Sequence, residues 1–224
     1  MTSDASALTD DGRPLRRDAA RNRERILAAA GEVFAARGLE VTLDDIAHHA
    51  GLGVGTVYRR FPSKEHLVEA MFVERMDEVA ALAERALAEP DPWKGFADFL
   101  QQTAELHSSD RGLREILLSN SFGQERVAAA KEKMIPIGTA VVDRAKAAGL
   151  LRKDFSPTDV PLIHLMIGAV AEYTHDVQPD LWRRYCQMLL DSLRAQPCAS
   201  TELSPAALDP DLLDMAMCSW RSKH

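Results

Sequence analysis

Two short helical segments separated by a glycine-containing break, within residues 42–64, constrain the fold more than any other stretch of the chain. Thr42 is a favourable N-cap, and Asp45 three residues later completes a pattern similar to a capping box. Gly51 is placed to end this helix, and a second helix is expected over residues 54–60. Two short helices joined by such a turn predict a helix-turn-helix, whose second helix can lie in a major groove of DNA.

The exposed side of this second helix has the chemistry of a DNA-binding surface. Gly55 keeps the helix slim, and the guanidinium groups of Arg59 and Arg60 suit phosphates and the acceptor edge of guanine. By chemistry alone, the same side chains would also suit the solvated face of an ordinary small helical domain. The residues expected to contact DNA are Thr42, Gly55, Thr56, Tyr58, Arg59, Arg60 and Lys64.

A set of positions across this segment follows one pattern: Thr42, Ile46, Ala47, Ala50, Gly51, Gly55, Thr56, Tyr58, Phe61, Lys64 and Leu67. This pattern resembles the signature of the TetR family of transcriptional regulators. The similarity is close over residues 21–75 and elsewhere extends only to length and helical character. Many members have serine where this chain has Gly53, and because glycine is also an acceptable N-cap, the difference leaves the expected fold unchanged.

Charge is distributed unevenly along the chain. The net charge of −7 argues against nucleic acid when it is taken for the whole chain. Residues 13–64, however, hold ten Lys and Arg against six Asp and Glu, a net of +4, so the remainder carries −11. A basic head on an acidic body suits a protein that presents one end to DNA.

The expected fold is all-α, with an N-terminal three-helix helix-turn-helix DNA-binding domain and a C-terminal helical ligand-binding and dimerisation domain. Residues 1–20 are expected to form a flexible basic arm, whose arginines either follow DNA or remain in solvent. The DNA-binding domain is placed at residues 21–80, with its motif at 42–61. The helical domain follows at 81–196, and residues 197–224 form a C-terminal extension.

Several helix boundaries follow from capping residues and breakers. Asp18 is expected to cap the first helix, and Gly38 follows its end near Arg37. A long helix over residues 64–88 belongs to both domains, and a shorter one is expected over 111–119. The next long helix, 124–148, contains Pro136 in its middle, which predicts a bend that either makes room for a small molecule or is a packing irregularity.

An apolar ligand pocket is predicted in the helical domain. His107 and His164 each lie on an apolar helix face, so they are either hydrogen-bonded core histidines or groups that orient a ligand. Glu172, in a nearly apolar helix, raises the same question. The predicted pocket residues are Trp93, Phe96, Leu100, Thr103, His107, Phe122, Met134, Ile137, Val141 and His164.

The two long helices near residues 160–173 and 179–194 carry more apolar surface than one protomer can cover. They predict a two-fold dimer with a four-helix interface of more than about 2,000 Å². TetR-like regulators dimerise in this way, so the resemblance implies the same arrangement. The interface residues are expected to be Val170, Tyr173, Trp182, Tyr185, Leu189 and Leu193. In the extension, residues 212–220 are expected to form a short amphipathic helix that docks on the body.

Other classes of site lack support in the sequence. Cys186, Cys198 and Cys218 are too few and too far apart for a disulfide framework or a zinc site, and no cofactor is expected. No catalytic constellation is recognisable, which argues against an enzyme. No segment has the length and apolar character of a membrane span or a signal peptide, so a cytoplasmic protein is expected.

These observations favour one function over two alternatives. The leading hypothesis is a homodimeric transcription factor that binds double-stranded DNA, most simply a repressor released from a palindromic operator by a small, mainly apolar ligand. A helical protein that binds a partner protein through its C-terminal surface is the second. A helical enzyme using His107 or His164 is the third.

Overall fold

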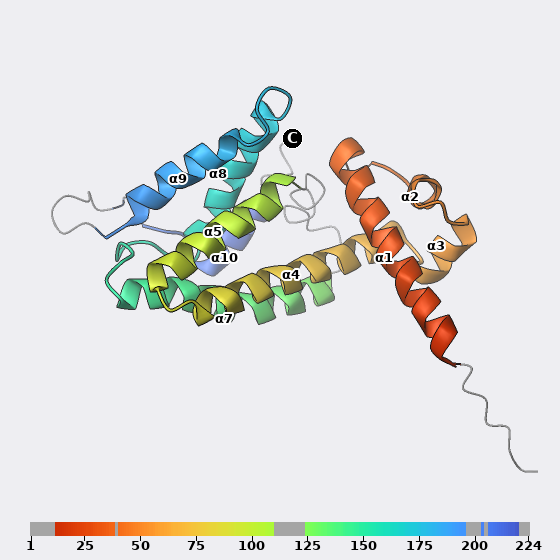
Figure 1. The fold of residues 1–224 in the computed structure, drawn as a ribbon, viewed down its shortest axis with the longest axis horizontal. Helices are drawn as coiled ribbons and strands as arrows, with labels where there is room; N and C mark the ends of the chain where they lie inside the picture. Colours follow the sequence, from red (N-terminus) through yellow and green to blue (C-terminus); the bar gives the residue numbers. More distant parts are fainter. Residues whose placement is uncertain (1–11, 39, 110–123, 196–202, 204–205, 220–224) are drawn as a thin grey trace, which may run out of the picture.

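The computed structural model describes residues 12–38, 40–109, 124–195, 203 and 206–219, and this part of the chain is built of helices. A head contains α1 (Gly12–Arg37), α2 (Leu43–His49) and α3 (Val54–Arg60). A body contains α5 (Pro92–Ser109), α7 (Gln124–Ala147), α8 (Asp159–Thr174) and α9 (Leu181–Leu193), with α10 (Pro210–Ser219) at its side. The long α4 (Lys64–Ala88) runs from the head into the body, as Figure 1 shows. The all-α prediction is confirmed.

The head folds around an apolar centre contributed by all three of its helices. Ile26 and Phe34 of α1, Ile46 of α2 and Val57 of α3 have no exposed surface. Gly38 adopts a positive φ of 71° after the last turn of α1, the left-handed conformation in which glycine avoids a steric penalty. The predicted end of α1 is therefore confirmed. The predicted bounds of α3 and α4 are confirmed as well.

The predicted start of the first helix is wrong. Asp18 lies inside α1, which begins six residues earlier at Gly12, so residues 12–20 of the predicted flexible arm are helical. Pro14 does not prevent this, because the N–H groups of a first helical turn have no intrahelical partner and a proline there loses no hydrogen bond. Residues 1–11 lie outside the described residues.

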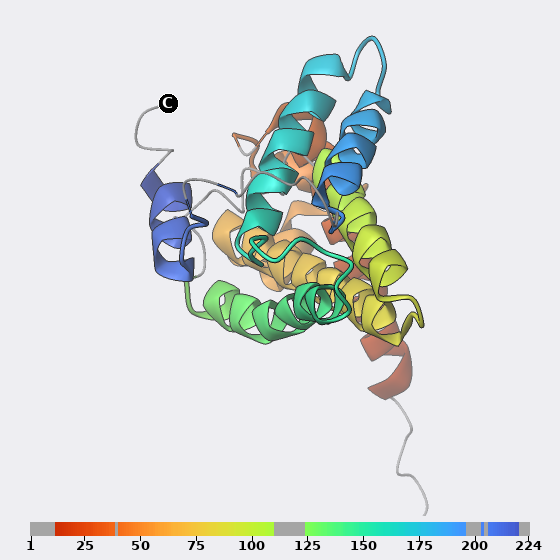
Figure 2. The same ribbon diagram turned by 90° about the vertical axis from the view of Figure 1, so that its left-hand side faces the viewer.

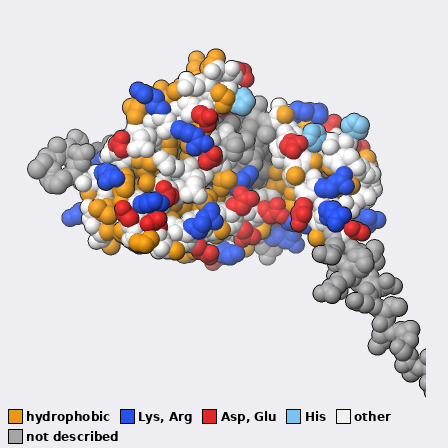
Figure 3. Space-filling view, in the orientation of Figure 1, with side chains coloured by type: hydrophobic (Ala, Val, Ile, Leu, Met, Phe, Trp, Pro, Cys, Tyr) orange, Lys and Arg blue, Asp and Glu red, His pale blue; other side chains and the backbone are white. Residues whose placement is uncertain are grey.

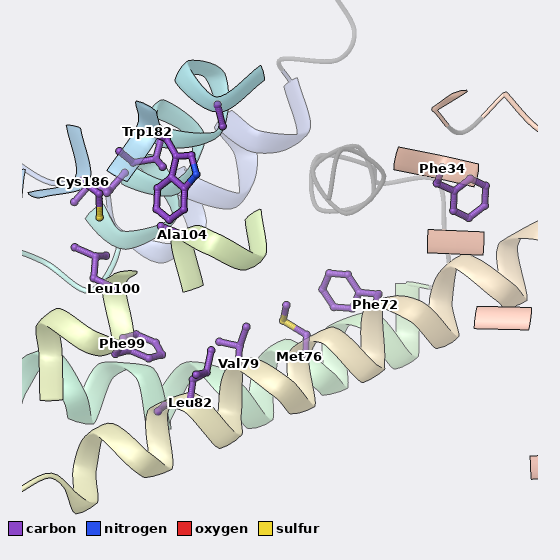
Figure 4. Packing of buried hydrophobic residues seen from close by; sticks show 14 of the residues in the cluster. Phe34, Phe72, Met76, Val79, Leu82, Phe99, Leu100, Ala104, Trp182 and Cys186 are labelled. Atoms are coloured by element: carbon purple, nitrogen blue, oxygen red, sulfur yellow. The ribbon is translucent and has the colours of Figure 1, made fainter. Parts of the chain in front are cut away.

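The helix α4 joins the two halves through one buried stripe. Phe72, Met76, Val79 and Leu82 follow one another along the helix, as Figure 4 shows, and each is 7% exposed or less. Phe72 belongs to the same contiguous hydrophobic cluster as Phe34 of the head, while Leu82 belongs to it together with residues of the body. The head and the body are therefore tied to opposite ends of one helix by packing.

The helix α7 is fastened along α4 by polar contacts at separate points of their overlap. Arg144 of α7 donates to the carbonyl oxygens of Ala86, Glu89 and Pro90, at 3.1, 2.6 and 3.1 Å. The guanidinium thereby satisfies carbonyl groups at the C-terminus of α4, where a cation is favourable. Nearer the head, Lys133 donates to Asp77 at 3.0 Å.

Single residues determine local features of the helices α7, α4 and α8. The helix α7 continues through Pro136 without interruption. Ser63 is the N-cap residue of α4, but its hydroxyl contacts His66 Nδ1 at 2.9 Å and makes no capping hydrogen bond to the backbone. The start of α8 is fixed by Asp159, whose carboxylate accepts a hydrogen bond from the Ser156 N–H at 2.7 Å. The expected helix over residues 111–119 lies outside the described residues.

Two absences complete the description of the visible chain. Among the residues that the structure describes, no helix has the length and hydropathy needed to cross a membrane. The same residues contain no group of three or more His, Cys, Asp and Glu side chains arranged to hold a metal ion.

The crossing of α4 and α5 generates a stability prediction. A Cβ atom added at Gly95 would lie 2.4 Å from the Ala86 carbonyl oxygen, whereas one added at Gly31 in α1 meets no atom within 4 Å. Gly95→Ala should therefore lower the free energy of unfolding by about 1–3 kcal/mol, since backbone must move. Gly31→Ala should raise it by up to about 1 kcal/mol because alanine favours a helix interior. Urea unfolding at fixed protein concentration measures both, and equal effects would contradict the packing described here.

Candidate functional site

The first candidate surface is the outer face of α3. Gly53 is the N-cap of this helix, with φ −65° and ψ 135°. Val57 is buried in the apolar centre of the head, while Tyr58, Arg59 and Arg60 are exposed. Lys and Arg side chains gather on the head over α1 and α3, and acidic ones gather over α4 between the head and the body, as Figure 3 shows. The basic end of the molecule is therefore the end that presents α3.

The helix before α3 is held by a complete capping box. The Thr42 hydroxyl accepts from the Asp45 N–H at 3.2 Å, and the Asp45 carboxylate accepts from the Thr42 N–H at 2.9 Å. Hydrogen bonds from Thr42, followed by the charge of Arg37, lower the pKa of Asp45. This predicted cap is confirmed, and it fixes where α2 begins.

The orientation of α2 and α3 is set by contacts with their surroundings. Arg25 of α1 donates to the Ala50 carbonyl oxygen at 2.8 Å, which holds the turn after α2. The carboxylate of Asp44 lies beside Tyr58, and its charge raises the pKa of that phenol. Lys64 lies half-buried in the first turn of α4.

The second candidate site is a cavity of about 620 Å³ in the body. It lies among α4, α5, α7, α8, the loop before α8 and a segment that leads into α10. Apolar side chains line most of it. They are Met76, Val79, Phe99, Met134, Ile135, Pro157, Val160, Pro161, Leu165, Ala207, Leu208, Pro210 and Leu213. The polar or charged lining residues are Thr103, His107, Lys131, Thr139, Ser156, Thr158, His164 and Asp209.

One polar cluster, Thr103, His107 and His164, has a defined hydrogen-bond pattern. The Thr103 hydroxyl lies 2.6 Å from the Phe99 carbonyl oxygen, which can only accept, so the hydroxyl donates there. His164 Nε2, 2.9 Å from the same hydroxyl oxygen, must then be the donor of that second bond. His107 Nδ1 donates to the Thr103 carbonyl oxygen at 2.8 Å, and the two imidazole rings stack with centroids 4.5 Å apart.

The buried histidine of this cluster is neutral. Burial, and then the proximity of His107, lower the pKa of His164 well below its usual range. A neutral imidazole can donate or accept a hydrogen bond without the desolvation cost of a buried charge. The first alternative left open for His164 by the sequence applies, since it is hydrogen-bonded within the core, and the side chain also lines the cavity. Glu172, in contrast, is exposed.

The predicted pocket residues divide into three groups. Thr103, His107, Met134 and His164 line the cavity. Trp93, Phe96, Leu100 and Val141 do not, because they are packed in the core, and Ile137 is partly buried against that core. Phe122 lies outside the described residues.

Two aromatic contacts of Phe96 explain why part of the pocket prediction failed. Phe96 packs against both Trp93 and Phe155 with ring centroids 5.7 Å apart in each pair, so it fills space and leaves none for a ligand. Phe99 was missed, although it shares one helix face with Thr103 and His107 at intervals of four residues. That spacing is a signal that could have found it.

The predicted dimer residues also separate into an inner and an outer face. Trp182 is only 4% exposed and Leu193 is also buried, so both belong to the protomer core and contribute little surface to another chain. Tyr173 is 92% exposed, and Tyr185 lies on the outer side of α9. Val170 and Leu189 are partly buried against the core. Met166 and Met188, which were not predicted, are more than half exposed beside them.

Comparison with known proteins bears on both halves of this chain. The profile described as "Bacterial regulatory proteins, tetR family" matches residues 26–71, and that of the SbtR-like transcriptional regulator C-terminal domain matches residues 91–195. A TetR transcription regulatory protein from Mycobacterium vanbaalenii is 31% identical, with a TM-score of 0.59. The similarity covers 81% of this chain and 99% of that structure. The chain belongs to the TetR family of transcriptional regulators.

Further relatives agree with this assignment. The TetR regulator SCO0520 from Streptomyces coelicolor is 28% identical over 78% of this chain and 99% of its own, with a TM-score of 0.58. The regulator TtgW from Pseudomonas putida is 42% identical over 59 residues, which cover 26% of this chain and 44% of TtgW. The chain thus spans less than half the length of that curated relative. TetR-family regulators are non-enzymatic DNA-binding proteins.

The buried histidine predicts how stability depends on pH. The unfolded chain protonates His164 near pH 6.5, whereas the folded TetR-type body holds it neutral, so the unfolding free energy should fall as the pH drops below that value. From pH 7 to pH 5 this one group can cost at most about 2 kcal/mol, the limit reached when the folded chain takes up no proton at His164. Urea unfolding at both pH values, at fixed protein concentration, should show a smaller loss for His164→Gln.

The control for this measurement is His175→Gln, which changes an exposed histidine at the end of the same helix. It should keep the pH dependence of the unaltered protein. An identical pH dependence in His164→Gln and in the unaltered protein would contradict a neutral, buried His164.

Proposed function

We propose that this TetR-family chain is a homodimeric repressor that binds a near-palindromic operator and is released from it by a small, mainly apolar molecule. The observation that carries the proposal is the placement of two sites on one helix. The head at one end of α4 presents the exposed side chains of α3, and Met76 and Val79 on the same helix line the cavity.

The DNA-binding residues divide into two roles. Thr42, Thr56, Tyr58 and Lys64 fix the position of the head on phosphates. Arg59 and Arg60, together with the Gly55 backbone, approach base edges in the major groove. Gly53 supplies no hydroxyl at the start of α3, so one phosphate contact available to serine is missing here.

Release of DNA follows from the position of the cavity. A ligand that displaces α7 or fills the space beside Met76 changes the tilt of α4, and therefore the separation of the two heads in a dimer. A typical coupling free energy of about 1–3 kcal/mol corresponds to a change of about 5–150-fold in affinity. That range is sufficient for a ligand to control occupancy of an operator.

The dimer is proposed to form through the outer faces of α8 and α9. Met166, Tyr173, Tyr185 and Met188 are large apolar or aromatic side chains that a lone protomer leaves exposed. Together with the partly buried Val170 and Leu189, they offer an apolar surface on two adjacent helices. A two-fold pairing of such helices places two copies of α3 about one or more turns of DNA apart.

Selection of bound duplexes from random DNA, followed by sequencing, tests the proposal directly. The recovered sequences should contain two inverted half-sites at a fixed spacing. A protein that shows no preference among duplexes at moderate salt would instead favour the alternative role of binding a partner protein.

Substitutions in α3 and α4 should separate positioning from sequence reading. Lys64→Ala should weaken binding to all duplexes alike and reduce the salt slope by about one. Arg59→Ala or Arg60→Ala should also reduce discrimination at one base position by about 1–3 kcal/mol. Fluorescence anisotropy with operator and random duplexes at several salt concentrations measures both effects.

The matched control is Lys153→Ala, which removes an exposed lysine from the body. It should change neither the affinity nor the salt slope. Equal losses on operator and random DNA for both arginine variants would contradict the proposed roles.

A single charge should identify the dimer surface. Met188→Glu places a carboxylate in the centre of the exposed apolar face of α9, and the cost of burying it should convert the dimer to monomers at micromolar concentration. Gln102→Glu adds the same charge at an exposed position of α5 and should leave the dimer intact. Sedimentation velocity measures both variants, and a monomeric unaltered protein would refute the proposed dimer.

A further inference from the structure

The segment at residues 207–213 contributes to the lining of the cavity although it lies beyond the part of the chain that matches the C-terminal family profile. That match ends at residue 195. Ala207, Leu208, Asp209, Pro210 and Leu213 nevertheless contribute lining atoms, alongside residues of α5, α7 and α8. Figure 2 shows α10 at the side of the body, separate from the α8–α9 pair. One wall of the cavity is therefore built by the C-terminal extension.

The extension is held in place by hydrogen bonds to the loop before α8. The Thr158 hydroxyl donates to the Leu208 carbonyl oxygen at 2.7 Å. Asp154 accepts from the Leu203 N–H at 2.9 Å, and its carboxylate is also bound by Arg152 at 2.6 and 2.9 Å. Because Thr158 itself lines the cavity, this attachment lies at the edge of the space that a ligand would occupy.

The first turn of α10 directs one apolar side chain inward. Asp209 accepts from the Leu212 N–H at 2.8 Å, which fixes the start of the helix. Leu213 is then 8% exposed and lines the cavity, while Leu212 beside it is 49% exposed. Two adjacent leucines thus have different environments, and only one of them faces the cavity.

The chemistry of the lining indicates which molecules suit this space. Its volume of about 620 Å³ lies within the usual range for small-molecule sites, about 300–1,000 Å³. Apolar side chains from α4, α5 and α8 line the same space as the extension, and the Thr103–His107–His164 cluster provides hydrogen-bonding groups, of which the buried His164 is held neutral. A charged group placed beside the neutral His164 would lose hydration without gaining an opposite charge from that side chain.

We propose that residues 207–213 form a closing wall of the ligand site, which holds an uncharged, mainly apolar molecule whose polar end meets the Thr103–His107–His164 cluster. This inference rests on the proposed ligand-responsive function and names the part of the chain that encloses the ligand. Leu213 supplies apolar contact, and the Thr158–Leu208 hydrogen bond keeps the wall attached.

Nile red, a neutral apolar dye with one carbonyl oxygen, is a suitable probe for the full-length protein. Leu213→Asp should weaken its binding about tenfold or more, since it removes apolar contact and places a charge in the wall. Leu212→Asp, which adds the same charge on the exposed side of the same turn, should stay within about twofold of the unaltered protein. Equal dye affinity in both variants and the unaltered protein would overturn the inference.

A second pair of variants tests the attachment without placing a charge in the wall. Thr158→Val removes the hydroxyl that holds Leu208 and should weaken dye binding, whereas Thr158→Ser retains the hydroxyl and should not. Bound dye should also slow hydrogen exchange at the Leu212 and Leu213 amides, whose hydrogen bonds to Asp209 hold the first turn of α10. Unchanged exchange on dye binding would show that the wall does not enclose the ligand.

Competition against the dye tests the ligand chemistry. Decanol, decanoate and decylammonium share one apolar chain and differ in their polar end. Decanol should displace Nile red at the lowest free concentration, and stronger displacement by either ion would overturn the assignment of an uncharged ligand.

Met134→Trp separates the inference from the proposed function, because it fills the cavity from α7 and leaves the residues of the extension unchanged. Loss of dye binding in Met134→Trp, with normal binding in Leu213→Asp and Thr158→Val, would leave the cavity as a ligand site and refute the wall. Failure of the unaltered protein to bind dye, or normal binding by Met134→Trp, would refute the cavity as the site and the inference with it.

Discussion

The burial of one apolar stripe along α4 is the interaction on which the rest of this structure depends. Leu67 and Phe72 bind the helix to the head, and Val79, Leu82 and Ala86 bind it to the body. Since a packed interface transmits displacement and does not absorb it, the two halves cannot reorient independently of this helix. Arg144 of α7 donates to three carbonyl oxygens at the C-terminal end of α4, so a displacement of α7 is transmitted to that end of α4.

The cavity beside this helix is an exception to the close packing elsewhere in the body. A domain of this size has enough apolar side chains to fill its interior, and unfilled apolar volume costs stability. The TetR-type body nevertheless leaves space between α4, α7 and α8, and it keeps His164 neutral and hydrogen-bonded at the edge of that space. This space lies next to the helix that positions the DNA-binding head. The stability lost by leaving it unfilled is the cost of the proposed ligand site.

Much of the head could be predicted from its residues because the signals there are local. Thr42 and Asp45 define one helix end by hydrogen bonds three residues apart, and Gly38 defines another by its backbone conformation. The body was predicted less completely. The periodicity of α5 identified an apolar face, yet Phe96 and Leu100 on that face are filled core positions while Phe99 and Thr103 border the cavity. Periodicity indicates which side of a helix is apolar but not which part of that side a neighbouring helix covers.

The sequence by itself determined the helical fold, the helix-turn-helix, the basic head and the single helix that joins both halves, because each depends on residues within a few turns of one another. Only the tertiary structure decided that Trp182 belongs to the protomer core, that Thr103 and His164 meet across 61 positions, and that Leu213 completes a wall of the cavity. Those outcomes depend on how distant helices are placed against each other. Such placement is fixed by the packing of the whole domain, which no local pattern records.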